Sequence, residues 1–149
     1  MGKIAGLKNK SPETYPQSQA KPTVIETLSK TLPFAALSNG GPVNLVDPIA
    51  FAGQPGGSKA TIMFSNYFDT SSGALTVEVE VVLDGDSPSY TTTFAVPAPS
   101  GTPTPFSFVF ELTGLAAGPH SIQVTGETTA GGETVDARNN SAVVIITSA

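Results

Sequence analysis

The chain has 149 residues, which is enough for one domain with a buried core. Hydrophobic residues make up 39% of it and charged residues 13%, a balance that excludes a wholly disordered protein. Cysteine is absent, which excludes disulfides and thiolate metal sites, and a single histidine argues against a zinc site. We therefore expect neither a cofactor nor a bound metal.

The first 22 residues differ in charge from the remainder. They carry four lysines and one glutamate, a net charge of +3, whereas residues 23–149 carry three basic and eleven acidic side chains, a net charge of −8. The segment has three prolines, no strand or helix periodicity, and no apolar run of the kind found in signal peptides. We predict an extended basic arm over residues 1–22 and one folded domain over residues 23–149. Such an arm is either a frayed end or a segment that docks on an acidic neighbour.

The elements at the start of the domain have weak signals. Residues 23–30 are predicted as a strand, although their apolar spacing also fits a helical turn. Residues 43–46 favour a short strand, which the Asp47-Pro48 pair ends, and residues 53–57 favour a loop.

A clearer alternation begins at residue 60. Residues 60–66 place Ile62 and Phe64 on one face of a strand, and residues 74–83 form the clearest strand of the chain. In that second strand the side chains predicted to face inward are Leu75, Val77, Val79 and Val81, while Thr76, Glu78 and Glu80 face outward. The tripeptide at residues 84–86 is typical of a hairpin turn, with a return strand over residues 89–96.

The last third of the domain continues the pattern. Residues 105–112 place Phe106, Phe108 and Phe110 on one side, and we predict that these rings form the centre of the core. Residues 114–119 indicate a corner, 120–124 a strand with Ile122 and Val124 inward, 127–133 a hairpin loop, and 142–147 the last strand. Strands recur about every ten residues without helical periodicity, so we predict an all-β fold, a single antiparallel sandwich that is immunoglobulin-like or jelly-roll-like.

Two sequence stretches resemble a known family. FELTGLAAGPHSIQVTG and ETVDARNNSAVVII are similar to the end of CARDB-type immunoglobulin-like domains, which are cell-adhesion-related modules of bacteria and archaea, and FSNYFDTSSGALTVEVEVVLDG fits the same plan. The matching positions are Leu115, Gly118, His120, Ile122, Val124, Asn139 and Asn140. The resemblance covers about residues 60–146. It implies an immunoglobulin-like sandwich and a surface or adhesion role.

The chain as a whole resembles a second group of proteins. A small, acidic, cysteine-free β-domain with a polar N-terminal arm is similar to the head decoration proteins of tailed bacteriophages. This resemblance rests on size, arm and composition, and no motif carries it. It implies a homotrimer that clamps capsid joints from outside.

Candidate catalytic groups are few. His120 is the only histidine, and its place after Pro119 at the start of a strand favours a hydrogen bond to the main chain of the corner over a Ser-His-acid triad. Glu78 and Glu80 lie two apart on one strand face, about 7 Å from each other at roughly 3.3 Å per residue. That separation suits a glycosidase pair, but alternating exposed glutamates are ordinary on a solvated strand. We predict that the protein is not an enzyme.

Elimination leaves a binding or structural role. We predict an accessory protein that stabilises a large protein assembly, specifically a capsid decoration protein on the exterior of a virion. The expected partners are copies of itself, with a trimer favoured, and a capsid; neither nucleic acid nor a membrane is expected. The arm residues predicted to contact a partner are Ile4, Leu7, Lys8, Lys10 and Tyr15. The alternative is an immunoglobulin-like adhesion or binding module that is extracellular or on the cell surface.

Overall fold

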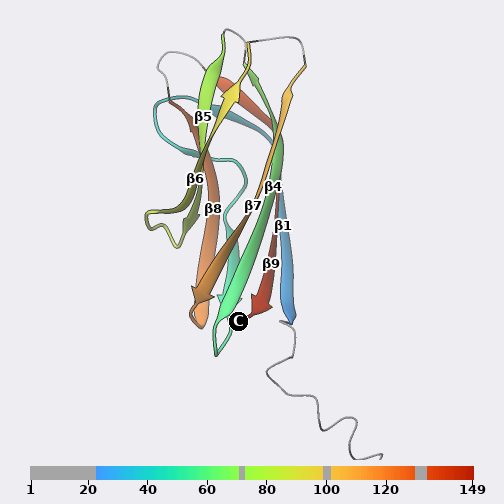
Figure 1. Cartoon of the computed structure of the whole chain (residues 1–149), viewed down its shortest axis with the longest axis vertical. Coiled ribbons are helices and arrows are strands. Elements are labelled where there is room, and N and C mark those ends of the chain that lie inside the picture. Colours follow the sequence, from blue (N-terminus) through green and yellow to red (C-terminus); the bar gives the residue numbers. More distant parts are fainter. Residues whose placement is uncertain (1–22, 71–72, 99–101, 130–133) are drawn as a thin grey trace, which may run out of the picture.

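A computed structural model describes residues 23–70, 73–98, 102–129 and 134–149. These residues form nine β-strands that pack as two facing antiparallel sheets (Figure 1). Sheet A has the order β1-β9-β4-β7; sheet B has the order β2-β8-β5-β6, and β3 also pairs with β8. The strands are β1 (Val24–Leu37), β2 (Val43–Asn44), β3 (Ile49–Gly53), β4 (Ser58–Thr70), β5 (Leu75–Leu83), β6 (Pro88–Val96), β7 (Thr104–Leu115), β8 (Gly118–Thr128) and β9 (Val135–Ser148).

The predicted all-β antiparallel sandwich is confirmed, and the strand order decides between its two forms. An immunoglobulin-like sandwich has its second and fifth strands side by side in one sheet and its third and sixth in the other. Here the first strand pairs with the last, and when the short β2 and β3 count as one strand, eight strands divide equally between the sheets. This arrangement is a jelly roll, so the immunoglobulin-like order implied by the CARDB resemblance is not the one observed.

The core lies between the sheets and is built by the predicted alternation. Leu75, Val77, Val79 and Val81 of β5 are buried, as are Ile62 and Phe64 of β4 and Ile122 and Val124 of β8. Glu78 and Glu80 alternate with the buried residues of β5 and face outward, as expected. The hairpin turn after β5 is also confirmed, because Asp84 and Gly85 both have positive φ and the Asp86 amide donates to the Leu83 carbonyl.

The weak sequence signals near the start of the domain predicted strands with inaccurate bounds and did not predict β3. Residues 23–30 are indeed a strand, but β1 continues to Leu37. The short strand predicted over residues 43–46 is only Val43–Asn44, and β3 was missed because Asp47-Pro48 and the following glycines resemble one long loop. The hairpin loop predicted for residues 127–133 lies partly outside the described residues, and β8 extends to Thr128.

One prediction about the core was wrong. Phe106, Phe108 and Phe110 are not at its centre; each is half-buried. They face inward as predicted, but β7 is the edge strand of sheet A, so each ring stays partly exposed. The fully enclosed large side chains include Phe64 and Phe68 of β4, which has paired strands on both sides.

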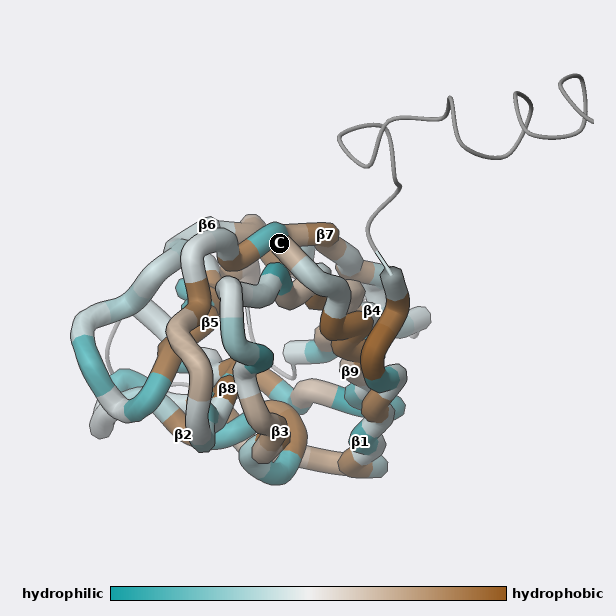
Figure 2. Tube along the Cα trace, turned by 90° about the horizontal axis from the view of Figure 1, so that it is seen from below, coloured by the Kyte–Doolittle hydropathy of each residue, from teal (hydrophilic) through white to brown (hydrophobic). Residues whose placement is uncertain are grey.

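The view along the long axis shows which strands of the two sheets lie next to each other. In Figure 2 the two sheets face each other, with β6 and β7 adjacent on one side and β1 near β3 on the opposite side.

The described part of the chain contains no helix with the length and apolar character needed to span a bilayer.

Candidate interaction surfaces and the histidine corner

His120 lies at a corner where three segments meet. Its Nδ1 is 2.7 Å from Oδ2 of Asp84, which follows β5, and its Nε2 is 2.8 Å from the carbonyl oxygen of Ala116, which precedes β8. The other oxygen of Asp84 accepts the backbone amide of Ser121 at 2.7 Å. The sequence-based expectation of a bond from His120 to the main chain of the corner is thus confirmed.

The atoms around His120 are packed so closely that Gly53 cannot be replaced by a residue with a side chain. The Phe51 ring lies 5.4 Å from the imidazole ring, centroid to centroid. A Cβ added at Gly53 would lie 2.0 Å from the Ala116 carbonyl oxygen and 3.2 Å from the imidazole, so only glycine fits there. Both nitrogens of His120 are occupied by this structural contact, and the residue ties the β5–β6 turn to β3 and β8.

The electrostatics of the corner favour a charged pair. The hydrogen bond to Asp84 raises the pKa of His120 above its usual value near 6.5, and the bond to Ala116 adds to the effect. Reciprocally, the bond from His120 lowers the pKa of Asp84, and the Ser121 amide contributes. Because both ring nitrogens face oxygen acceptors, the imidazolium, which donates from both, suits the site better than the neutral ring.

The outer face of sheet B carries acids. Glu78 and Glu80 face outward from β5, and Glu127 of β8 lies directly opposite Glu78 in the strand register. Partial burial is the main cause that raises the pKa of Glu80. Its hydrogen bond to Glu78 and its repulsion from that carboxylate raise the pKa further. Within the described ranges, no three His, Asp or Glu side chains gather as metal ligands would. We interpret these residues as an acidic surface.

A buried amide pair, which the sequence did not reveal, joins the strands of sheet A. Asn66 of β4 donates from Nδ2 to Oδ1 of Asn140 at 2.9 Å, and Asn140 Nδ2 is 3.1 Å from the carbonyls of both Leu32 and Ala137. The preceding Asn139 has φ of +52°, and the register between β4 and β9 shifts at this point. The Asn-Asn-Ser sequence is therefore a β-bulge whose second asparagine satisfies backbone carbonyls. The Asn-Asn pair hints at the bulge, because asparagine adopts positive φ more readily than most residues, but it gives no sign of the partner Asn66.

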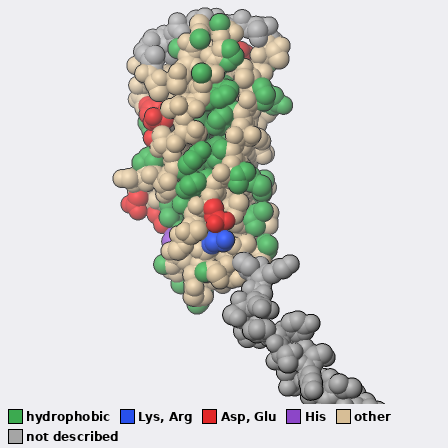
Figure 3. Space-filling model, viewed as in Figure 1, with side chains coloured by type: hydrophobic (Ala, Val, Ile, Leu, Met, Phe, Trp, Pro, Cys, Tyr) green, Lys and Arg blue, Asp and Glu red, His purple; other side chains and the backbone are tan. Residues whose placement is uncertain are grey.

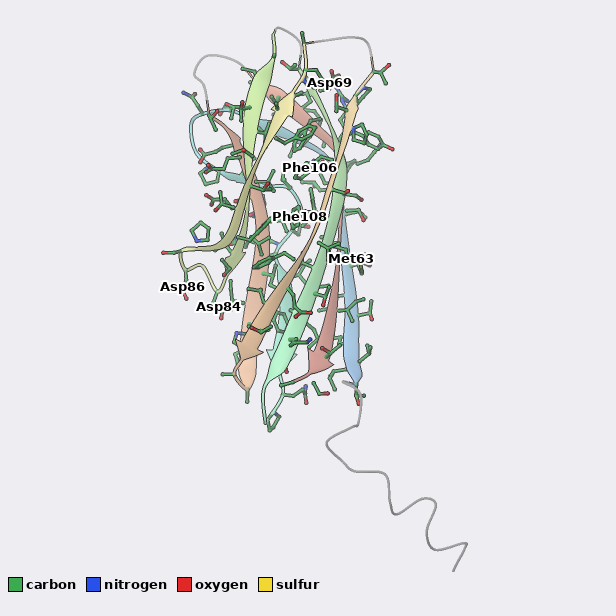
Figure 4. The ribbon with its side chains drawn as sticks, in the orientation of Figure 1. Met63, Asp69, Asp84, Asp86, Phe106 and Phe108 are labelled. Carbon is green, nitrogen blue, oxygen red and sulfur yellow. The ribbon has the colours of Figure 1, made fainter. Side chains whose placement is uncertain are left out.

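Between the edges of the two sheets lies an aromatic seam, a column of half-buried rings from β6 and β7. Its members are Tyr90, Phe94, Phe106, Phe108 and Phe110. Ring centroids are 4.6 Å apart for Tyr90 and Phe110, 5.3 Å for Tyr90 and Phe108, and 5.1 Å for Phe94 and Phe106. Figure 4 shows Phe106 and Phe108 in the gap between β6 and β7, and Figure 3 shows hydrophobic side chains running down the middle of this face.

The outer face of sheet A is uncharged around its middle. A shallow hollow of about 530 Å³ is lined there by Met63, Ser65, Ser107, Val109, Ser141 and Val143, together with parts of Phe64 and Phe108. Val109 is 67% exposed and Met63 36%. Met63 lies on the opposite side of sheet A from the aromatic seam (Figure 4). Charged pairs lie toward the two ends of the face, Lys59 with Glu111 at one and Arg138 with Asp136 at the other.

The arm residues predicted to contact a partner, Ile4, Leu7, Lys8, Lys10 and Tyr15, lie outside the described residues. The structure does show where the arm joins the domain. The Thr23 amide donates to the Ser148 hydroxyl at 2.9 Å, and the Ser148 amide donates to the Thr23 carbonyl at 2.9 Å. The arm therefore joins the sandwich at one end, beside the last strand.

Comparison with known proteins gives likenesses of structure only. No protein-family model and no curated protein matches the chain. A chain from infectious bursal disease virus, Gx strain, is 12% identical, with 83% of this chain and 34% of that chain covered and a TM-score of 0.49. The CBM36-1 domain of a multidomain xylanase from the hindgut metagenome of Trinervitermes trinervoides is 12% identical, covering 79% and 96%, with a TM-score of 0.45.

A third similar structure is Eiger TNF from S. frugiperda, at 12% identity, 84% and 92% coverage and a TM-score of 0.41. The chain spans about a third of the length of the bursal disease virus chains that it matches. At these identities and scores the likenesses say nothing about function, so function has to be inferred from the surfaces of the chain itself.

Proposed function

We propose that this chain is a non-enzymatic accessory protein of a large protein assembly. In its specific form, the proposal is a decoration protein on the exterior of a viral capsid, with residues 1–22 clamping a neighbouring subunit. The observation that carries it is the division of charge, +3 over residues 1–22 and −8 over residues 23–149. A basic segment joined to an acidic domain favours contact with another acidic surface, including that of a second copy.

The geometry of the junction supports a contact between subunits. The arm joins the domain at one end of the sandwich, beside Ser148. Twenty-two extended residues reach about 70 Å at roughly 3.3 Å each, whereas β9, with 14 residues, spans about 46 Å at that rise. The arm is therefore long enough to pass the full length of its own domain and reach a neighbour.

Two further features support the proposal. The only histidine has both ring nitrogens occupied by Asp84 and the Ala116 carbonyl, which leaves it in a structural role. The jelly roll is a fold that recurs in viral capsid proteins and lectins, although fold alone does not decide function.

The proposal is tested by rebinding the protein to its particles. Particles are purified from the native source, stripped of the chain at high salt, and incubated with the full chain or with a chain lacking residues 1–22. We expect the truncated protein to keep its melting temperature and to attach more weakly. A matched pair separates charge from general damage: Lys8→Glu should weaken attachment at low salt, and Lys30→Glu, which makes the same charge change on β1, should not. Equal attachment of the truncated and full chains would overturn the clamp.

A further inference from the structure

The aromatic seam lies between two sheet edges that lack a neighbouring strand. In the described part of the chain, β6 pairs only with β5, and β7 pairs only with β4. Each of these edges therefore presents backbone donors and acceptors that another strand could pair with. The rings between the edges are half-buried, so a partner that covered the seam would remove apolar surface from water as well.

The charge distribution indicates which partner can approach this surface. β6 contains no charged residue, and β7 contains only Glu111, whose carboxylate is 3.4 Å from Lys59 Nζ. Glu78, Glu80 and Glu127 face outward from sheet B instead. Two copies of a domain with a net charge of −8 repel each other, so close contact requires a surface without unpaired acids. The seam meets that requirement.

The opposite edge of sheet A is β1, and it carries features that prevent pairing with a strand of another molecule. Glu26 and Lys30 of β1 pair in register with the buried Ile146 and Ala142. Both side chains therefore lie on the side of β1 that faces the gap between the two sheets, which we call the gap-facing side. Pro33 follows them in the same strand. Gap-facing charges and proline are common means of preventing strand pairing between molecules. In the middle of β6 and β7 the equivalent gap-facing positions carry no charge, and most of them hold aromatic rings, with Thr92 between the two rings of β6.

We propose that the aromatic seam is the contact between copies of this chain, with the β6 and β7 edges of one copy packed on the same region of a second. The arm is a poorer occupant, because a basic segment is attracted to the acidic face of sheet B more than to an acid-free seam. The proposal concerns the contact between domains and does not depend on attachment to a capsid. A chain that associates with itself but binds no particle would leave it standing.

The test is the mass of the full-length protein in solution, measured by light scattering and sedimentation over a wide concentration range. The wild type should form a discrete oligomer, whose mass gives the number of copies. Thr92→Lys places an ammonium group on the gap-facing side of β6, between Tyr90 and Phe94, and should weaken association at least about tenfold. Thr27→Lys, an exposed position on the β1 edge, is the control and should leave the mass unchanged.

Several outcomes would overturn the proposal. These are a wild type that stays monomeric throughout, a folded Thr92→Lys variant that associates like the wild type, or loss of the oligomer on Lys8→Glu/Lys10→Glu substitution alone, which would identify the arm as the contact. If Thr92→Lys does not fold, hydrogen exchange on the wild type decides. Amides of β6 and β7 should become protected as concentration rises, and protection confined to other strands would exclude the seam.

Discussion

The two edges of sheet A are built from opposite kinds of residue. One row across the sheet makes this plain: Lys30 of β1 pairs with Ala142, Ala142 with Phe64, and Phe64 with Phe108 of β7. All four side chains point to the same side of the sheet, toward the gap between the layers. Only Ala142 and Phe64, on the two central strands, are buried. One edge thus presents an ammonium group where the other presents a ring.

The difference between the two edges shows that the direction of a side chain and its enclosure are separate properties, which alternation alone does not distinguish. Alternation tells which side of a strand faces inward, and it did so correctly for β4 and β7. Enclosure depends on whether another strand lies alongside, which the sheet order decides. An inward position on an edge is only partly enclosed, so it accepts a charge at β1 and holds a half-buried ring at β7.

The largest expected effect compares the rings of this row. Phe64→Ala should lower the free energy of unfolding by about 3–5 kcal/mol, the usual loss for an enclosed phenylalanine. Phe108→Ala should cost roughly half, about 1.5–2.5 kcal/mol, because less apolar area leaves water at an open edge. Lys30→Ala is the control and should change it by less than about 0.5 kcal/mol. Denaturant melts of dilute protein measure all three, and equal losses for the two rings would contradict the difference in enclosure.

A smaller effect is expected at the β-bulge of β9, which lies between the β1 edge and the central strand β4 of sheet A. Asn140→Ala removes the acceptor of the Asn66 amide and the donor to the Leu32 and Ala137 carbonyls; the bond to Leu32 is part-buried and the other two are buried. It should cost about 1–3 kcal/mol, the range for leaving buried polar groups unpaired. Asn139→Gly should be nearly neutral, because glycine adopts the positive φ of that position at no steric cost. Thermal melts that rank the two variants in the reverse order would show that the bulge is not held by Asn140.

The smallest effect is a pH dependence at the His120 corner. The pKa of His120 is raised in the folded state, so its contribution to stability is complete below about 6.5 and is lost as pH rises through the folded pKa. The pKa of Asp84 is lowered, so its contribution is present above about 3.8 and is lost as pH falls through the folded pKa. The pair should therefore stabilise most between these values. Melting temperatures at pH 6 and pH 8.5 should differ more for the wild type than for Asp84→Asn, and identical differences would exclude the pair as the cause.

Several parts of the molecule could be predicted from residues close together in the chain. The alternation of residues 74–83 and the Asp-Gly-Asp turn specify a strand, its inward face and its hairpin, since each depends on neighbours only. The placing of His120 after a corner was likewise enough to predict its bond to the main chain. The Asn66–Asn140 pair joins residues 74 positions apart, and no local pattern announces it.

By itself the sequence determined the fold class, the inward faces of most strands, and the charge contrast between residues 1–22 and the domain. Only the tertiary structure decided that the sandwich is a jelly roll, that β7 is an edge, and that its rings pack against those of β6. The physical reason is that side-chain direction follows from the backbone geometry of a single strand. Enclosure, by contrast, follows from which distant strands come to lie beside it.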